Sequence, residues 1–138
     1  MIEQILLGSV LIIVTLVIEV IFIEITVRSL KKFDPVLQVT NIRKTTLVLI
    51  GITLWLLAAM SIAIWIWALA LRSLDVFDTL EGALYFSMVA FTTLGLGDLT
   101  LPVDWRLLSG FLSANGLFLF GLNTAILIEV MRRMSIDH

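Results

Sequence analysis

Two stretches of the chain are long, apolar and free of charged side chains: Thr45 to Leu71 and Leu107 to Ile128. An α-helix needs about 20 such residues to cross the hydrocarbon core of a bilayer, so each stretch predicts a membrane-spanning helix. A third stretch, Gln4 to Ile18, is also uncharged but is followed by Glu19 and Glu24, so it spans only if Glu19 lies well inside the membrane. No basic residue precedes this stretch, so we expect a retained span and not a cleaved signal peptide.

Composition agrees with an integral membrane protein and excludes several other classes. Of the 138 residues, 60% are hydrophobic, and the mean hydropathy is +1.12. A soluble domain of this length carries far more charge, and three spans leave no room for a separate soluble domain. The chain has no cysteine, so we expect neither a disulfide nor a zinc site. The net charge of −2 does not indicate a nucleic-acid partner, and we expect no cofactor and no enzymatic activity.

Between the two clearest spans lies an apolar segment, Gly82 to Phe91, that is too short to cross a bilayer. Asp78 and Glu81 precede it with the spacing of a capping box, and both acids suit a helix N-terminus. We therefore predict a re-entrant half-membrane helix that ends near Thr92. The "LGLGD" segment then returns to the surface as non-helical backbone, which is tolerated at membrane depth only where protein buries it or where it lines an aqueous path.

The Lys and Arg residues predict the orientation of the chain. Seven of the nine lie in the loop after the first span or near the C-terminus: Arg28, Lys31, Lys32, Arg43, Lys44, Arg132 and Arg133. The positive-inside rule therefore places residues 28–44 and the C-terminus in the cytoplasm and the N-terminus outside. An aromatic belt is expected at the outer boundary from Trp65, Trp67 and Trp105. Acidic residues on the same side either solvate a loop or form a vestibule that concentrates cations: Asp75, Asp78, Glu81, Asp98 and Asp104.

The alternation of glycine and leucine after the half-helix has a specific chemical interpretation. Glycine reaches backbone conformations that residues with a Cβ avoid, so Gly95 and Gly97 can turn successive carbonyls to one side of the strand. Four such strands around an axis can replace the hydration shell of a cation. The hydroxyl of Thr93 adds an oxygen at the inner end, and the C-terminus of the half-helix, near Phe91 and Thr92, carries partial negative charge.

At these positions the chain resembles the potassium channel family. The segment "ALYFSMVAFTTLGLGD", residues 83–98, is similar to that family's pore helix and selectivity filter, whose usual core is Thr-Val-Gly-Tyr-Gly-Asp. The segment "ANGLFLFGLNTAIL", residues 114–127, resembles the pore-lining inner helix, with Gly116 at the place of a hinge glycine. The resemblance covers residues 45–133 and leaves the first span unmatched.

The resemblance implies an all-α membrane protein with three transmembrane helices, a re-entrant pore helix and a filter loop, assembled as a homotetramer in the cell membrane. The additional N-terminal helix is expected at 1–28, a basic cytoplasmic loop at 29–44, the pore domain at 45–133 and a short tail at 134–138. Within the pore domain, the outer helix is expected at 45–71, the pore helix at 79–92, the filter at 93–98 and the inner helix at 106–131. The expected partners are further copies of the chain and membrane lipids.

Three sets of site residues follow from the resemblance. Potassium ions are expected at the carbonyls of a filter whose residues are Thr93, Leu94, Gly95, Leu96 and Gly97, with K⁺ bound at the first four. The filter is expected to be supported by Tyr85, Phe86, Val89, Thr92 and Asp98. The cavity and gate candidates are Gly116, Leu117, Phe120, Thr124 and Ile128; ordinary helix packing explains each about equally well, and Gly116 is either a hinge or a point of close contact with the pore helix.

Two positions depart from the family pattern. Leu96 stands where tyrosine is usual, as in some filters of two-pore-domain potassium channels, so packing is expected to brace this filter more than hydrogen bonds do. Val89 stands where some members carry an acid that partners the filter aspartate, so Asp98 is expected to find water, Tyr85 or a neighbour's Arg106. The first function implied is a potassium-conducting channel. The alternatives are a non-selective or sodium-permeable channel with the same pore and, less strongly indicated, a non-conducting membrane subunit or transporter component.

Glu19 is the charged residue deepest in the first span. A carboxylate at the centre of a spanning helix costs about 2.5–3.5 kcal/mol on insertion scales, so it is expected to be protonated, paired or turned toward protein. It is either a proton- or ligand-sensitive gating site or a neutral carboxyl bonded to a hydroxyl such as that of Ser61. Asn123 is expected to make a structural hydrogen bond between helices, and Glu24 to pair with Arg28 one turn away.

Overall fold

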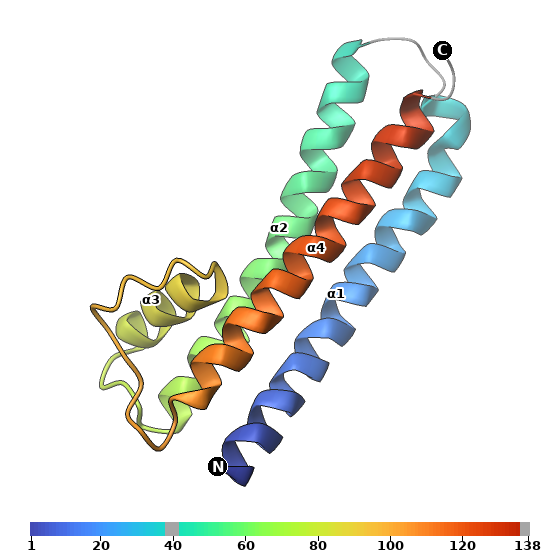
Figure 1. The fold of residues 1–138 in the computed structure, drawn as a ribbon. Helices are drawn as coiled ribbons and strands as arrows, with labels where there is room; N and C mark the ends of the chain where they lie inside the picture. Colours follow the sequence, from blue (N-terminus) through green and yellow to red (C-terminus); the bar gives the residue numbers. More distant parts are fainter. Residues whose placement is uncertain (38–41, 136–138) are drawn as a thin grey trace.

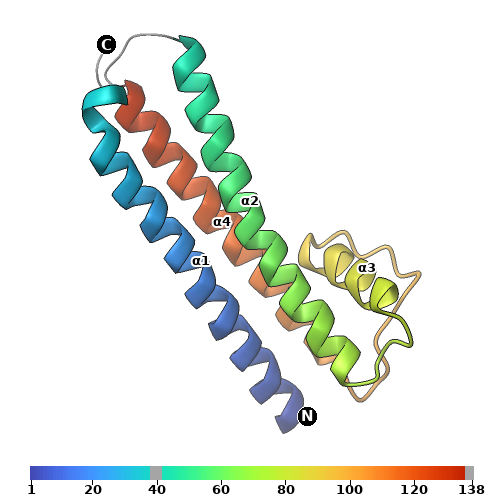
Figure 2. The ribbon, with the colours of Figure 1, turned by 180° about the vertical axis from the view of Figure 1, so that it is seen from behind.

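The computed structural model describes residues 1–37 and 42–135, and these residues form four helices and no β-strand. The helices are α1 (Ile2–Leu37), α2 (Ile42–Ser73), α3 (Leu80–Phe91) and α4 (Leu107–Ser135). In Figure 1, α1, α2 and α4 run side by side as a long bundle, and α3 lies beside the half of the bundle that contains the N-terminus. The reverse view in Figure 2 shows that α3 lies on the side of α2 and α4 that faces away from α1.

Three of these helices are long and apolar enough to cross a membrane. The candidate spans are Ile2–Leu30, Thr45–Ser73 and Leu107–Arg132. Helix α3 has 12 residues, about 18 Å of helix, which is well short of the ~30 Å hydrocarbon core. The predicted fold class, three spanning helices with one short apolar helix between the second and third, is therefore confirmed.

The helices extend beyond several predicted boundaries. A basic loop was predicted at 29–44, but α1 continues to Leu37 and α2 already begins at Ile42. Lys and Arg are good helix formers, so a basic composition marks the end of the apolar span and not the end of the helix. Of the predicted loop, residues 38–41 lie outside the described residues. At the other end, α4 continues to Ser135, and the remainder of the predicted tail lies outside the described residues.

The first turn of α3 is capped by Thr79, so the predicted capping box that begins at Asp78 is wrong. Thr79 has extended backbone (φ −123°, ψ 147°), and its Oγ1 accepts a hydrogen bond of 3.1 Å from the N–H of Gly82. A threonine hydroxyl satisfies a free amide of the first helical turn as an aspartate would. Glu81 lies inside the first turn, where its charge complements the helix dipole.

The packed core lies where α2, α3 and α4 meet. Its largest fully buried side chains include Trp67 of α2, Phe91 of α3, and Leu108 and Leu112 of α4. Trp67 is wholly buried, so the aromatic belt predicted from the sequence does not include it; Trp65, which is 44% exposed, is free to meet lipid headgroups. This core fixes the end of α3 from which the glycine segment departs.

Gly116 marks the closest approach of α4 to α3. A Cβ at Gly116 would lie 1.9 Å from the carbonyl oxygen of Phe91 and 2.8 Å from its carbonyl carbon. Only glycine permits this contact between two backbones. Of the two roles expected for Gly116, the structure therefore supports close contact with the predicted pore helix.

Candidate functional site

The backbone after α3 is tied to the last turn of that helix. The N–H of Thr93 donates to the carbonyl of Ala90 at 3.0 Å, and those of Leu94 and Gly95 both donate to the carbonyl of Val89, at 2.9 and 3.4 Å. In a trans peptide the carbonyl of one residue points opposite to the N–H of the next. The carbonyls of Thr93 and Leu94 therefore point away from the end of α3.

These hydrogen bonds also change the expected role of the helix end. The carbonyl of Ala90 accepts a second hydrogen bond, of 2.8 Å, from Ser113 Oγ of α4, and the carbonyl of Phe91 faces Gly116. The partial negative charge predicted near Phe91 and Thr92 is therefore directed partly at α4. The hydroxyl of Thr92 donates to the carbonyl of Met88 at 2.8 Å, which also caps the helix.

Every second residue of the glycine segment has a left-handed backbone. The φ angles are +59° at Thr93, +57° at Gly95 and +78° at Gly97. Glycine adopts these angles without strain, but a β-branched threonine does so at a cost of about 1–3 kcal/mol. Such strain persists where surrounding contacts impose it, and it is typical of functional backbone.

Asp98 finds its partner within the same chain. The hydroxyl of Tyr85, in α3, donates a hydrogen bond of 2.7 Å to Asp98 Oδ2. This bond lowers the pKa of Asp98 below its ordinary value and raises the pKa of Tyr85 above its ordinary value. Tyr85 is one of the three partners expected for Asp98. The bond joins the far end of the glycine segment to the helix that precedes it.

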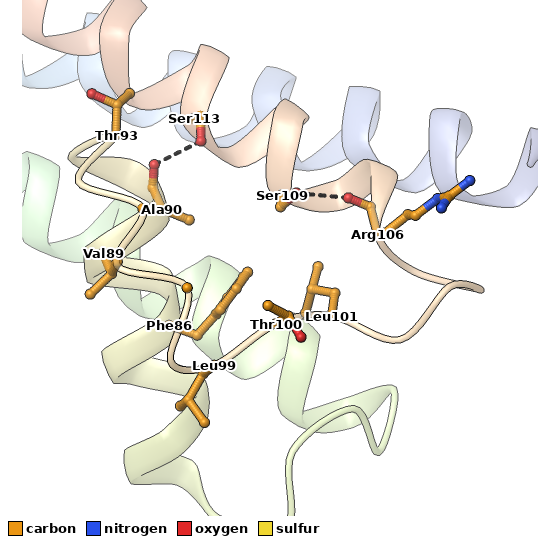
Figure 3. A pocket seen from close by; sticks show the side chains of 12 residues that line it. Phe86, Val89, Ala90, Thr93, Leu99, Thr100, Leu101, Arg106, Ser109 and Ser113 are labelled. Carbon is orange, nitrogen blue, oxygen red and sulfur yellow. Dashed lines mark hydrogen bonds between the residues drawn. The ribbon is translucent and has the colours of Figure 1, made fainter.

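A cavity of about 340 Å³ lies between the glycine segment, the segment 99–101 and the start of α4. Figure 3 shows Phe86, Val89 and Ala90 of α3 on one side of it and Ser109 and Ser113 of α4 on another. Predicted support residues Phe86 and Val89 thus both contribute to this space. The side chains of Leu94 and Leu96 remain 62% and 60% exposed.

One face of α4 is left uncovered by the other helices. Leu117, Phe120 and Ile128 are 61%, 41% and 60% exposed, and Thr124 is exposed as well. These residues are three or four positions apart and so share one face of the helix. Phe120 also lies against Phe91, with 6.1 Å between the ring centroids. The predicted cavity residues thus lie on one continuous face, whereas Gly116 is buried against α3.

Helix α1 packs along α4 through polar contacts that were not predicted from the sequence. Gln4 Oε1 accepts a hydrogen bond of 3.0 Å from the backbone N–H of Leu107, at the start of α4. Asn115 Nδ2 of α4 donates to Thr15 Oγ1 at 2.8 Å. Gln4, Thr15 and Asn115 are all buried. Both hydrogen bonds join segments about 100 residues apart, so they hold α1 against α4.

Gly8 completes this contact, because a Cβ there would lie 2.6 Å from the ring of Phe111. A signal for the interface is present in the sequence. Gln4, Gly8, Thr15 and Glu19 are small or polar residues that recur at helical spacing on one side of an otherwise apolar span. In a membrane, such residues mark the side of a helix that faces protein.

Glu19 is fully buried on this same side of α1. The predicted alternative bond to Ser61 is absent, since neither carboxyl oxygen of Glu19 has a hydrogen-bond partner, and the Ser61 hydroxyl donates to the carbonyl of Leu57 in its own helix. The amide of Asn123, on α4, lies close enough to interact with the carboxyl of Glu19. Neither side chain completes a hydrogen bond of good geometry.

The charged residues near the ends of the spans form local pairs. Arg28 pairs with Glu24, as the spacing predicted. Arg132 lies 2.8 Å from Glu129. Arg72 lies 3.1 Å from Asp75, which supports the loop-solvating interpretation of that aspartate. Exposed pairs of this kind contribute at most about 1 kcal/mol each.

The fold and the site together define a class of protein. It is a helical membrane protein in which a short helix packs against two spanning helices and leads into a glycine-rich strand, residues 93–97. Comparison with known families gives the same class, since residues 52–133 match a family described as "Ion channel". The match covers more than half of the chain, so the protein belongs to this ion channel family, whose members are channels and not enzymes. No curated protein and no solved structure matches the chain.

Proposed function

We propose that the protein is a potassium-conducting channel whose filter is the strand from Thr93 to Gly97. The observation that carries this proposal is the alternation of left-handed backbone at Thr93, Gly95 and Gly97. Together with the amide hydrogen bonds to Val89, it supports carbonyls that line one side of the strand. Carbonyls of Thr93, Leu94, Gly95 and Leu96 would replace the water around a monovalent cation.

One chain supplies one such strand, so the proposal requires a homotetramer. Two features support it. The filter leucines and the face of α4 that carries Leu117 and Ile128 are exposed in the single chain, so both are available to contact further copies of the chain. Around a four-fold axis, that α4 face would line the inner cavity, and Phe120 and Ile128 would narrow it.

The proposed orientation places the N-terminus and Asp98 outside and the C-terminus in the cytoplasm, with lipid around the outer faces of α1 and α2. The Lys and Arg distribution supports it. Acidic residues on the outer side, including Asp78 and Asp98, would then raise the cation concentration at the outer mouth. Ions would pass by mutual repulsion between neighbouring filter sites.

A sodium-permeable or non-selective channel is the second candidate, and one observation favours it. The side chain of Leu96 has no hydrogen-bonding group, so the filter lacks a brace at the position where tyrosine is usual in the potassium channel family. The Tyr85–Asp98 hydrogen bond braces only the outer end of the strand. A softer filter would discriminate less between cations of different size.

Flux from liposomes containing the purified protein tests the proposal. Gly95→Ala places a Cβ on a residue with φ +57°, so potassium flux should be lost. Gly51→Ala is the matched control, because Gly51 has ordinary helical backbone in α2 and no neighbouring atom within 4 Å. Flux that survives Gly95→Ala would mean that ions do not use this strand, and no flux from the unaltered protein would indicate a non-conducting subunit.

The assembly is tested separately by the mass of the particle in detergent or nanodiscs. The proposal predicts four chains of 15.4 kDa each. A stable monomer or dimer under conditions that give flux would contradict a four-fold filter.

A further inference from the structure

Helix α1 lies outside the matched channel segment, yet it contacts α4 along much of its length. The contacts follow the same order along both helices: Gln4 with Leu107, Gly8 with Phe111, and Thr15 with Asn115. Both helices run in the same direction, so contacts further along α1 lie further along α4 (Figures 1 and 2). Glu19 and Asn123 are the next pair in this order.

The Glu19–Asn123 pair is a concentration of buried polar atoms without hydrogen bonds. Both carboxyl oxygens of Glu19 and both amide atoms of Asn123 are buried and unpaired. Glu19 is fully buried, and Asn123 is 6% exposed. Leaving four buried polar atoms without hydrogen bonds lowers the stability of the folded state. A ligand that completes these hydrogen bonds would therefore stabilise the contact between α1 and α4.

The proton is the ligand whose chemistry fits this pair. A protonated carboxyl can donate to the amide oxygen while its other oxygen accepts from the amide nitrogen, and this satisfies both groups together. An ionised carboxylate only accepts hydrogen bonds, so the amide oxygen of Asn123 stays unpaired and an uncompensated charge is buried.

The surroundings contain no countercharge at this depth. Helix α2 has no charged residue between Lys44 and Arg72, and α4 has none between Arg106 and Glu129. On α1 itself, the neighbouring charges are Glu3, near the N-terminus, and Glu24, which is paired with Arg28. An ionised Glu19 would therefore have Asn123 as its sole polar partner among the described residues of the facing helix, and water would have to enter.

We propose that Glu19 and Asn123 form a proton-controlled clamp that holds α1 against α4, the helix whose opposite face we assign to the pore. In the protonated state the acid–amide pair closes the interface. Loss of the proton opens the interface and releases the inner half of α4 from α1. The consequence for conduction rests on the proposed channel function, but the clamp itself does not.

Disulfide cross-linking tests the clamp directly, because the chain has no cysteine of its own. Thr26 and Val130 lie two helical turns beyond Glu19 and Asn123, and both are buried. The double variant Thr26→Cys/Val130→Cys is reconstituted in liposomes and oxidised with copper phenanthroline. The pH is varied from about 4 to 9, a range that spans glutamate ionisation in ordinary and buried settings.

The matched control adds Glu19→Gln to the same cysteine pair. Glutamine keeps the donor and the acceptor at every pH, and it also corrects for the pH dependence of thiol oxidation. The cross-linked fraction should fall several-fold with rising pH in the Glu19 background, relative to the Gln background. Identical pH profiles in the two backgrounds would overturn the clamp, and so would a cysteine pair that never cross-links in either.

Potassium flux from the same liposomes separates the clamp from the channel proposal. Flux should depend on pH with Glu19 and lose that dependence with Glu19→Gln. A pH-dependent cross-link with pH-independent flux overturns the link between clamp and pore. A pH-dependent cross-link in a protein that passes no ions supports the clamp and contradicts the proposed function.

Discussion

Replacing Gly116 with alanine should displace the glycine strand, because Gly116 is the contact between α4 and the end of α3. The added Cβ would lie 1.9 Å from the carbonyl oxygen of Phe91, whereas ordinary contact begins at 3.4 Å. The two backbones must therefore part by about 1.5 Å, the difference between these distances. The Cβ is held in place by the backbone of α4 and the Phe91 carbonyl is main chain, so no side-chain rotation relieves the overlap.

The cost of this substitution follows from the overlap. Overpacking a tight core costs about 1–3 kcal/mol, and an overlap between two backbones belongs at the upper end of that range. About 3 kcal/mol should lower the midpoint of thermal unfolding on the order of 10 °C. Because the strand leaves α3 directly after Phe91, potassium flux should fall as well.

The assay is thermal unfolding of the purified protein in detergent, followed by liposome flux. Gly110→Ala is the control, since it lies in the same helix with no atom within 4 Å of the added Cβ. It should be neutral or slightly stabilising, because alanine favours a helix by about 0.5–1 kcal/mol over glycine. If Gly116→Ala unfolds at the same temperature as the unaltered protein and conducts as well, the inferred backbone contact is wrong.

Three further predictions concern other contacts. Tyr85→Phe removes the hydroxyl that lowers the pKa of Asp98, so this pKa should rise toward the ordinary value of ~3.9. Asp98 in the variant then becomes protonated at a higher pH than in the unaltered protein. When conductance is measured against external pH, its loss on acidification should therefore begin at a higher pH in the variant. Thr79→Ala removes the N-cap of α3 and should cost about 0.5–2 kcal/mol of thermal stability, with Thr79→Asp retaining it; equal stability of the two variants would argue against the cap. Gly8→Ala should push the ring of Phe111 aside and, because a side chain can yield, should cost only about 1 kcal/mol; a loss as large as that of Gly116→Ala would mean that this interface is rigid.

The sequence predicted the spans well because charge is excluded from the middle of a bilayer. The uncharged runs before Arg72 and after Arg106 predicted α2 and α4, and an apolar run too short to cross the bilayer predicted α3. Boundaries were less predictable, because basic residues end the apolar stretch without ending the helix. That is why α1 continues to Leu37.

The contacts between helices were harder to predict. In a soluble protein, the apolar side of a helix shows which side is buried, but a helix in lipid is apolar all round. Trp67 was therefore predicted to lie in the aromatic belt at the membrane boundary, although it is wholly buried. Tyr85 could be named as a possible partner of Asp98 because the two residues belong to one local segment. The contacts of Gln4, Gly8 and Thr15 with α4 join distant segments, and no local rule specifies the register between them.

The most direct test of the account is the reversal potential of the purified protein under bi-ionic conditions, with potassium on one side of a planar bilayer and sodium on the other. A rigid strand of carbonyls from Thr93 to Leu96 predicts a reversal potential displaced far from zero, in the direction that marks potassium as the permeant ion. A reversal potential near zero would contradict the potassium-selective filter and leave the softer, non-selective pore.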